Sequence, residues 1–375
     1  MTDIVEHAFW ELLKAGLWER DPVLETKLTD EQWMEVMKQG KRQTLLGVLF
    51  DGMLRLPTEL QPEEETRMKW FWQVNKIEQA NRKLNRVLVE FIDKLQEQGI
   101  PSLLLKGQSY AVLYPQPLHR QCGDIDLYIG LNHYKSTCQW AKEWNLIGTK
   151  DEEGFRHQQI TVDGINIDLH RIAIEFPNPL KHKKFREWSE RMLESSTSTF
   201  VPTTESQPIH IPELEYNVIF VFYHLLSHYF ISGIGLRQFC DWARMLHVSK
   251  SEIDYNRLEK DINDYGLMNA WQVFGYILVH QLGLPQEEFP FYKDTRKKSA
   301  NLLEDILEQG NFGHYAEKQR PNASNYVLRR GKRFVFRTKR YIQTMRLFPS
   351  LGFGAYLLYL YERGGHFFTD IFKKA

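Results

Sequence analysis

Two aspartates separated by one residue lie in a short apolar segment. Asp124 and Asp126 alternate with apolar side chains in the run Gly-Asp-Ile-Asp-Leu-Tyr-Ile at 123–129. Residues two apart in a strand point to the same face, so the two carboxylates project together, about 7 Å apart at the backbone. Such close like charges raise each other's pKa unless a cation lies between them. A divalent metal is the natural counter-charge, and Mg²⁺ held by carboxylates is the usual arrangement in phosphoryl and nucleotidyl transfer. A strand end with two solvated aspartates is the alternative.

A third aspartate lies near the end of a second apolar segment. Asp168 is part of Ile-Asn-Ile-Asp-Leu-His at 165–170. If this strand pairs beside the first, Asp168 joins the two other acids. Three acids can hold two metal ions, and one of them can accept a proton from, or orient, an attacking hydroxyl. The alternative for Asp168 is a cap on the following turn, and for His170 a packed or surface histidine is favoured over a ligand.

A short polar turn upstream could bind phosphate. Lys106-Gly107-Gln108-Ser109 stands between a predicted strand and the start of a predicted helix. A glycine lets the backbone approach a ligand closely, while the N–H groups at a helix start, a serine hydroxyl and a lysine all favour an anion. Glycine also makes ordinary turns. Arg120 could meet a triphosphate or could simply pair with an acid.

The segment that carries these residues has the pattern of a compact α/β unit. Apolar runs and helical spacing predict a strand at 100–105, a helix at 110–114, a strand at 124–129 and a helix at 134–144. Two alternating segments, 158–162 and 165–169, then flank Asp163-Gly164, which is the strongest short-range hairpin signal in the chain. This order of elements predicts an α/β fold (α+β) for the centre of the chain.

Helices are expected on both sides of this unit. Thr29 has the chemistry of a helix N-cap, and the uninterrupted periodic segment from Pro62 to Gly99 predicts one helix of about 35 residues. Further helices are predicted at 212–228, 236–248, 253–282 (two helices) and 322–349. The chain is therefore divided into an N-terminal helical region (1–99), an α/β core (100–205) and a C-terminal helical domain (206–375).

These motifs together resemble a known family. Leu-Lys-Gly at 105–107, Tyr114, Arg120, Gly-Asp-Ile-Asp-Leu at 123–127 and Ile-Asp-Leu-His at 167–170 are similar to the bacterial uncharacterised nucleotidyltransferase family, within the DNA polymerase beta-like nucleotidyltransferase superfamily. The later His224, Leu236-Arg237 and Asp241-Trp242-Ala243 also resemble the helical region of this family.

The resemblance implies both a fold and a reaction. It implies a mixed sheet with helices on one side, with Asp124 and Asp126 binding two Mg²⁺ ions and Asp168 near the acceptor hydroxyl. A nucleoside triphosphate would bind at the turn around Gly107, and pyrophosphate would leave. The superfamily usually has Gly-Ser at this turn, whereas here Gln108 separates the glycine from the serine.

Composition limits the partners. Lys plus Arg equals Asp plus Glu, 48 against 48, so no net charge attracts nucleic acid or a membrane. The N-terminus lacks the pattern of a secretory leader, no stretch is apolar enough to span a bilayer, and the three cysteines fit a reducing cytoplasm. The segment from Arg329 to Arg346 has eight Arg or Lys and no acid; it could bind RNA, although a solvated helix face is slightly favoured.

The sequence therefore predicts a cytoplasmic, Mg²⁺-dependent nucleotidyltransferase. Its acceptor could be a small molecule, a protein or RNA. A catalytically inactive nucleotide-binding or interaction module on the same fold is the alternative. His224 and His228 have the spacing of zinc ligands, but packed histidines are favoured because the glutamate of a zinc hydrolase motif is missing. Arg237 and Asp241 are spaced as an i,i+4 ion pair that could still organise the cleft.

Overall fold

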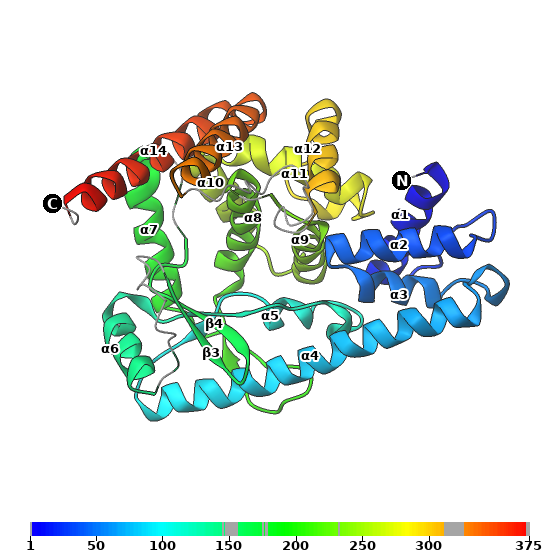
Figure 1. The fold of residues 1–375 in the computed structure, drawn as a ribbon, viewed down its shortest axis with the longest axis horizontal. Coiled ribbons are helices and arrows are strands. Elements are labelled where there is room, and N and C mark those ends of the chain that lie inside the picture. The colour runs from blue at the N-terminus through cyan, green and yellow to red at the C-terminus, as the bar shows by residue number, and fades with distance from the viewer. Residues whose placement is uncertain are drawn as a thin grey trace.

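The computed structural model describes residues 2–144, 146, 157–174, 176, 179–231, 233–310 and 326–372 of the 375-residue chain. This part of the chain is mainly helical and includes a four-stranded and a two-stranded sheet (Figure 1). The larger sheet lies between one long helix and a group of C-terminal helices.

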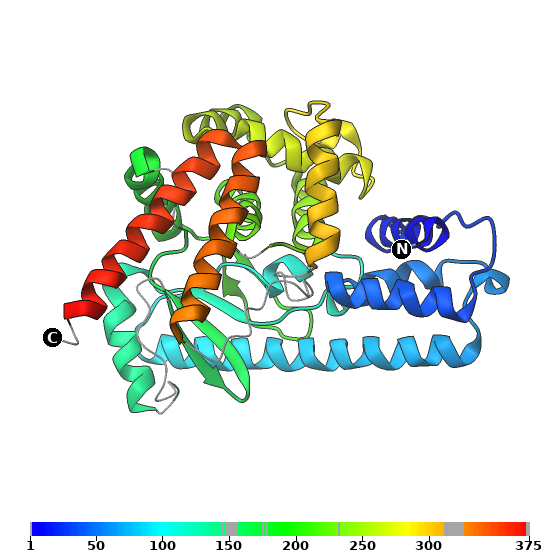
Figure 2. The same ribbon diagram turned by 45° about the horizontal axis from the view of Figure 1, so that its top comes forward.

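The N-terminal elements are helical, as predicted. They are α1 (Asp3–Trp18), α2 (Asp30–Gln43), α3 (Leu46–Leu54), the short 3-10 helix η1 (Thr58–Leu60) and α4 (Glu64–Glu97). At the start of α2, the Thr29 hydroxyl accepts from the Gln32 N–H, and the Gln32 side chain accepts from the Thr29 N–H. This capping box confirms the predicted N-cap. The predicted long helix is also confirmed: α4 has 34 residues and connects α1–α3 with the sheet (Figure 2).

The larger sheet is mixed and has the strand order β1-β2-β4-β3. Its strands are β1 (Leu103–Leu104), β2 (Ile125–Tyr128), β3 (His157–Val162) and β4 (Ile165–His170), with α5 (Gln108–Ala111), η2 (Pro117–His119) and α6 (Gly130–Glu143) between the first three. β2 and β4 are parallel, and the two outer pairs are antiparallel. The predicted hairpin is confirmed, and both of its turn residues, Asp163 and Gly164, have positive φ as a tight turn of this kind requires.

The two faces of this sheet differ in chemistry because side chains alternate along each strand. Ile125, Leu127, Ile167 and Leu169 are buried on one face, in an apolar cluster with residues of α4 and with Ala141 of α6. The opposite face carries polar residues, including Asp126 and Asp168. Because α4 and α6 cover the apolar face, the acids on the opposite face are turned toward the C-terminal helices.

The C-terminal half is again mainly helical. Its elements are α7 (Pro179–Glu194), β5 (Thr199–Phe200), β6 (Ile209–His210), α8 (Leu214–Ile231), α9 (Leu236–Ser249), α10 (Tyr255–Tyr265), α11 (Met268–His280), η3 (Gln286–Glu288), α12 (Arg296–Gln309), α13 (Tyr326–Leu347) and α14 (Pro349–Phe372). The two-residue strands β5 and β6 pair with each other and were not predicted. Helices α13 and α14 pack together, and α13 also contacts α8 (Figure 2).

One continuous apolar core joins the two ends of the chain. It includes Phe9 of α1, Trp33 of α2, Phe222 of α8, Trp242 of α9 and Trp271 of α11, all fully buried. The division at 99/100 and 205/206 stays a prediction. None of the helices in the described ranges combines the length and the apolar character that crossing a bilayer requires.

Candidate functional site

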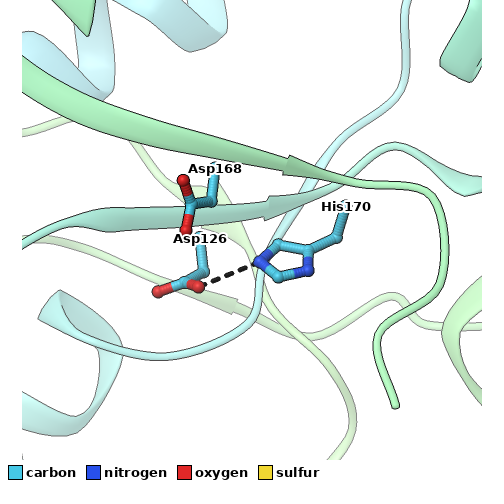
Figure 3. Close-up of side chains that lie close together, drawn as sticks. All are labelled: Asp126, Asp168 and His170. Carbon is cyan, nitrogen blue, oxygen red and sulfur yellow. Dashed lines mark hydrogen bonds and ion pairs between the residues drawn. The ribbon is translucent and has the colours of Figure 1, made fainter. Parts of the chain in front are cut away.

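The sheet brings the predicted acids together on its polar face. β2 and β4 are paired in parallel with Asp126 directly opposite Asp168. The ligand atoms of Asp126, Asp168 and His170 lie within 4.8 Å of one another (Figure 3). Asp124 directly precedes β2 and lines the same cavity as these three residues. We call Asp124, Asp126, Asp168 and His170 the acid cluster.

His170 is the member of the cluster that the sequence analysis did not favour. Its Nε2 lies 2.9 Å from Oδ1 of Asp126. The signal that could have found it is the same spacing used for the first two aspartates: His170 follows Asp168 by two residues in one strand, so both point to the same face.

Asp126 is the centre of the cluster. Its side chain is only 3% exposed, and Oδ2 lies 2.8 Å from the ammonium of Lys106. Burial alone would raise the pKa of Asp126, but the charge of Lys106 and the hydrogen bond with His170 hold this pKa well below its usual value. Asp126 therefore remains ionised in the folded protein.

The other two acids leave the cluster with uncompensated negative charge. The charge of Asp126 raises the pKa of Asp124, burial raises it further, and Lys106 partly offsets both effects. Asp168 accepts a hydrogen bond of 2.9 Å from Gln159 of β3. Three carboxylates thus face one lysine, and such a set of oxygen donors suits a divalent cation such as Mg²⁺.

The acid cluster forms one wall of a cavity of about 310 Å³. Lys106 lies on this wall, and α8 provides the opposite wall with His224, Ser227 and His228. His157 of β3 also lines the cavity, and the remaining lining is apolar or aromatic: Ile172, Ala173, Ile174, Tyr223, Leu226, Phe230, Ile231, Tyr341 of α13, and Ala355, Leu358 and Tyr359 of α14. The site therefore has one charged wall, polar side chains on α8, and an otherwise mainly apolar lining.

The two histidines of α8 form a pair. Nε2 of His224 lies 3.1 Å from Nε2 of His228. Burial lowers the pKa of His228 to about 4 and that of His224 well below its usual value, so both rings are neutral near pH 7. In the described ranges, the one group of three donors close enough to hold a metal is Asp126, Asp168 and His170. A zinc hydrolase built on His224 and His228 therefore has no support.

The polar turn lies beside the acid cluster, as predicted. Gly107 has a φ of +81°, in a region that other residues rarely adopt, and it precedes the four-residue helix α5. Gln108 and Ser109 are buried, yet neither the Gln108 amide nor the Ser109 hydroxyl has a hydrogen-bond partner in the described part of the chain. Buried polar groups are normally paired, so these are candidates for ligand contacts.

Arg120 lies elsewhere. It is 4% exposed and holds Asp241 of α9 with both ends of its guanidinium, Nε to Oδ1 at 3.0 Å and Nη2 to Oδ2 at 2.6 Å. The hydroxyl of Tyr114 donates to Oδ1 of the same carboxylate at 2.7 Å. The sequence left two roles open for Arg120, contact with a triphosphate and pairing with an acid. In the structure Arg120 pairs with an acid. The structure also corrects the expected i,i+4 pair, because Asp241 pairs with Arg120 and not with Arg237.

Comparisons with known proteins give the family of this chain. A family model described as an uncharacterised nucleotidyltransferase matches residues 29–283, which include the whole acid cluster, α8 and α9. A crystal structure of an antigenic nucleotidyltransferase-like protein from Paracoccidioides brasiliensis shares 15% identity, covers 45% of this chain and 76% of that chain, and has a TM-score of 0.28. No curated protein matches the chain. Because the family model matches well over half of its length, this chain belongs to the uncharacterised nucleotidyltransferase family.

Proposed function

We propose that this protein is a Mg²⁺-dependent nucleotidyltransferase. It transfers a nucleoside monophosphate from a nucleoside triphosphate to a hydroxyl of an acceptor. The observation that carries the proposal is the parallel register that sets Asp126 opposite Asp168 on the polar face of the sheet. Membership of the family supports the reaction class.

The acids divide the work in this proposal. Asp124 and Asp126 would hold the divalent ions through their carboxylate oxygens, and Lys106 and His170 fix the orientation of Asp126. When bound, the ions neutralise the negative charge that develops on the phosphate. The acceptor oxygen forms a bond to the α-phosphorus, and the bond from this phosphorus to the bridging oxygen breaks. Pyrophosphate leaves, and the hydroxyl proton passes to Asp168.

We place the triphosphate at the polar turn. Lys106 lines the cavity, Gly107 follows it directly in the chain, and Ser109 is three residues after it. The unpartnered hydroxyl of Ser109 supports a contact with a phosphate oxygen, with Gln108 as an additional donor. Direct contact of Arg120 with the triphosphate stays a prediction, and its ion pair with Asp241 favours a supporting role for this residue.

The test measures transfer of labelled nucleotide. Purified protein is incubated with Mg²⁺ and each α-labelled triphosphate, together with a small-molecule extract, a protein extract or total RNA. We expect label in one acceptor pool, release of pyrophosphate, and loss of both in Asp124→Ala and Asp126→Ala. Asp163→Asn, in the exposed hairpin turn, is the matched control and should retain activity.

Two outcomes count against the proposal. Wild-type activity in either aspartate variant would remove these acids from the reaction. Triphosphate binding that is equal with and without Mg²⁺, with no transfer to any pool, would favour the inactive nucleotide-binding module.

A further inference from the structure

We propose that Arg237, in the first turn of α9, binds the β- and γ-phosphates of the nucleotide and then the leaving pyrophosphate. This inference rests on the proposed function and adds a residue from the helical wall to it. It also gives to Arg237 the phosphate contact that the sequence suggested for Arg120.

Arg237 does not form the ion pair with Asp241 that the sequence predicted, so its guanidinium is available to bind a ligand. Helical spacing would pair it with Asp241, but both oxygens of that carboxylate are taken by Arg120. Within the described ranges, no carboxylate lies within ion-pair distance of the Arg237 guanidinium. Its hydrogen bond is from Nη1 to the backbone oxygen of Gln121 at 2.5 Å, while Nε has no partner among the residues that the structure describes.

The position of Arg237 suits a phosphate bound to the acid cluster. Gln121, whose backbone oxygen it contacts, is three residues before Asp124. The positive charge of Arg237 lowers the pKa of Asp124, and the same charge lowers the pKa of Lys106 and of His228. The hydrogen bond therefore places the guanidinium beside the loop that leads to Asp124, and its charge acts on Asp124, Lys106 and His228.

The energetics of this arginine favour an anion. Burial lowers the pKa of Arg237, and the neighbouring Arg120 lowers it further. A buried charge is normally paired, because desolvation without a partner is costly. An anionic ligand would remove this cost. The planar fork of a guanidinium matches two phosphate oxygens, and charge-assisted hydrogen bonds of this kind are stronger than neutral ones.

The neighbouring helix adds donors on the same side. Helix α5 packs against α9. It contains Gln108 and Ser109, which are 3% and 6% exposed and have unpartnered polar atoms. Pyrophosphate is the part of the substrate that most needs such donors, because charge develops on its bridging oxygen as the bond to the α-phosphorus breaks.

Calorimetry on the full chain tests this assignment without knowledge of the acceptor. Wild type, Arg237→Gln and Arg237→Lys are titrated in Mg²⁺ with pyrophosphate, with the four non-hydrolysable triphosphates and with the four monophosphates. In Arg237→Gln we expect pyrophosphate and triphosphate affinity to fall by roughly tenfold to a hundredfold and monophosphate affinity to stay within about twofold. Arg237→Lys keeps the positive charge but lacks the planar guanidinium. Its affinity for pyrophosphate and triphosphate should lie between those of wild type and Arg237→Gln.

The control lies on the same helix. Arg244 also donates to backbone oxygens, those of Leu113 and Leu17, so Arg244→Gln should affect packing and leave all three affinities unchanged. Unchanged triphosphate affinity in folded Arg237→Gln, or an equal loss for monophosphates, would overturn the assignment while leaving the proposed function standing. Wild-type protein that binds none of these ligands would overturn both. If Arg237→Gln does not fold, the Arg237→Lys variant decides. A pyrophosphate affinity of Arg237→Lys equal to that of wild type would also overturn the assignment.

Discussion

Two clusters of buried charged side chains differ in their balance of charge: in only one of them are positive and negative charges equal in number. In the first, Arg120 faces Asp241, and both carboxylate oxygens have partners. In the second, three carboxylates of the acid cluster face one ammonium, that of Lys106.

This difference separates scaffold from site. A charge pair that is fully hydrogen-bonded is stable as it is and needs no ligand. An excess of like charge costs folding free energy and is relieved by a cation, so it marks a functional site more strongly than burial alone. The balanced cluster fixes the loop before β2, and in the proposed function the unbalanced cluster carries out the reaction. The two clusters should therefore respond in opposite ways to removal of one carboxylate.

The largest expected effect is on activity, from Asp124→Asn. Removal of this charge should lower nucleotidyl transfer by at least about 1,000-fold, because the divalent ions lose one of their ligands. The free energy of unfolding should stay within about 1 kcal/mol of wild type, because the charge of Asp126 and burial raise the pKa of Asp124, so that its negative charge does not stabilise the fold. Mn²⁺ binding followed by electron paramagnetic resonance, together with urea unfolding, measures both. A large loss of stability would make the acid cluster structural.

The opposite result is expected for Asp241→Asn. This change leaves the buried guanidinium of Arg120 without a counter-charge, and breaking a buried pair in this way costs about 3 to 5 kcal/mol. Urea unfolding should show the loss, while Mn²⁺ affinity measured well below the melting temperature should be retained. Stability equal to that of wild type would mean that the balanced cluster does not hold the loop.

Local rules account for the parts of the site that were predicted. Alternation along a strand gave the common face of Asp124 and Asp126, and the Asp163-Gly164 turn fixed the hairpin that includes Asp168. Uninterrupted periodicity predicted α4, whose 34 residues differ little from the expected length. These features depend on neighbours in the sequence, which a single chain is sufficient to reveal.

The features that were missed depend on distant contacts. The partner of Arg120 is 121 residues away, so spacing along the chain could not identify it. The cavity wall comes from α8, α13 and α14, whose position relative to β2 no local pattern encodes. Strand β1 has only Leu103 and Leu104, which pair with Tyr128 and Leu127 of β2, so the apolar run at 100–105 overstated its length.

A third cluster of charged side chains, around His119, changes its net charge with pH. His119 lies 2.6 Å from Oδ1 of Asp51 on α3 and 2.8 Å from Oε1 of Glu78 on α4. Burial alone would lower the pKa of His119, but the two acids raise it on balance above its usual 6.5. The protonated ring therefore stabilises the fold fully below pH 6.5, and this contribution is lost as pH rises through the folded pKa.

His119→Gln tests this dependence. Wild type should exceed the variant in free energy of unfolding by about 1 to 3 kcal/mol near pH 6, with a smaller difference at pH 9. Urea unfolding across this range measures it, and His210→Gln, at an exposed position, is the control with a flat difference. If the difference in free energy of unfolding between wild type and His119→Gln grew with pH, the protonated ring of His119 would not be what stabilises the fold.

The smallest expected effect is that of Tyr114→Phe, which removes one hydrogen bond from the balanced cluster and no charge. Asp241 keeps both contacts with Arg120, so the loss should be about 0.5 to 1.5 kcal/mol, well below that of Asp241→Asn. Urea unfolding of the single and double variants gives the coupling between the two side chains. If Tyr114→Phe costs as much as Asp241→Asn, the hydroxyl is as important as the charge, and balance of charge is not what distinguishes this cluster from the acid cluster.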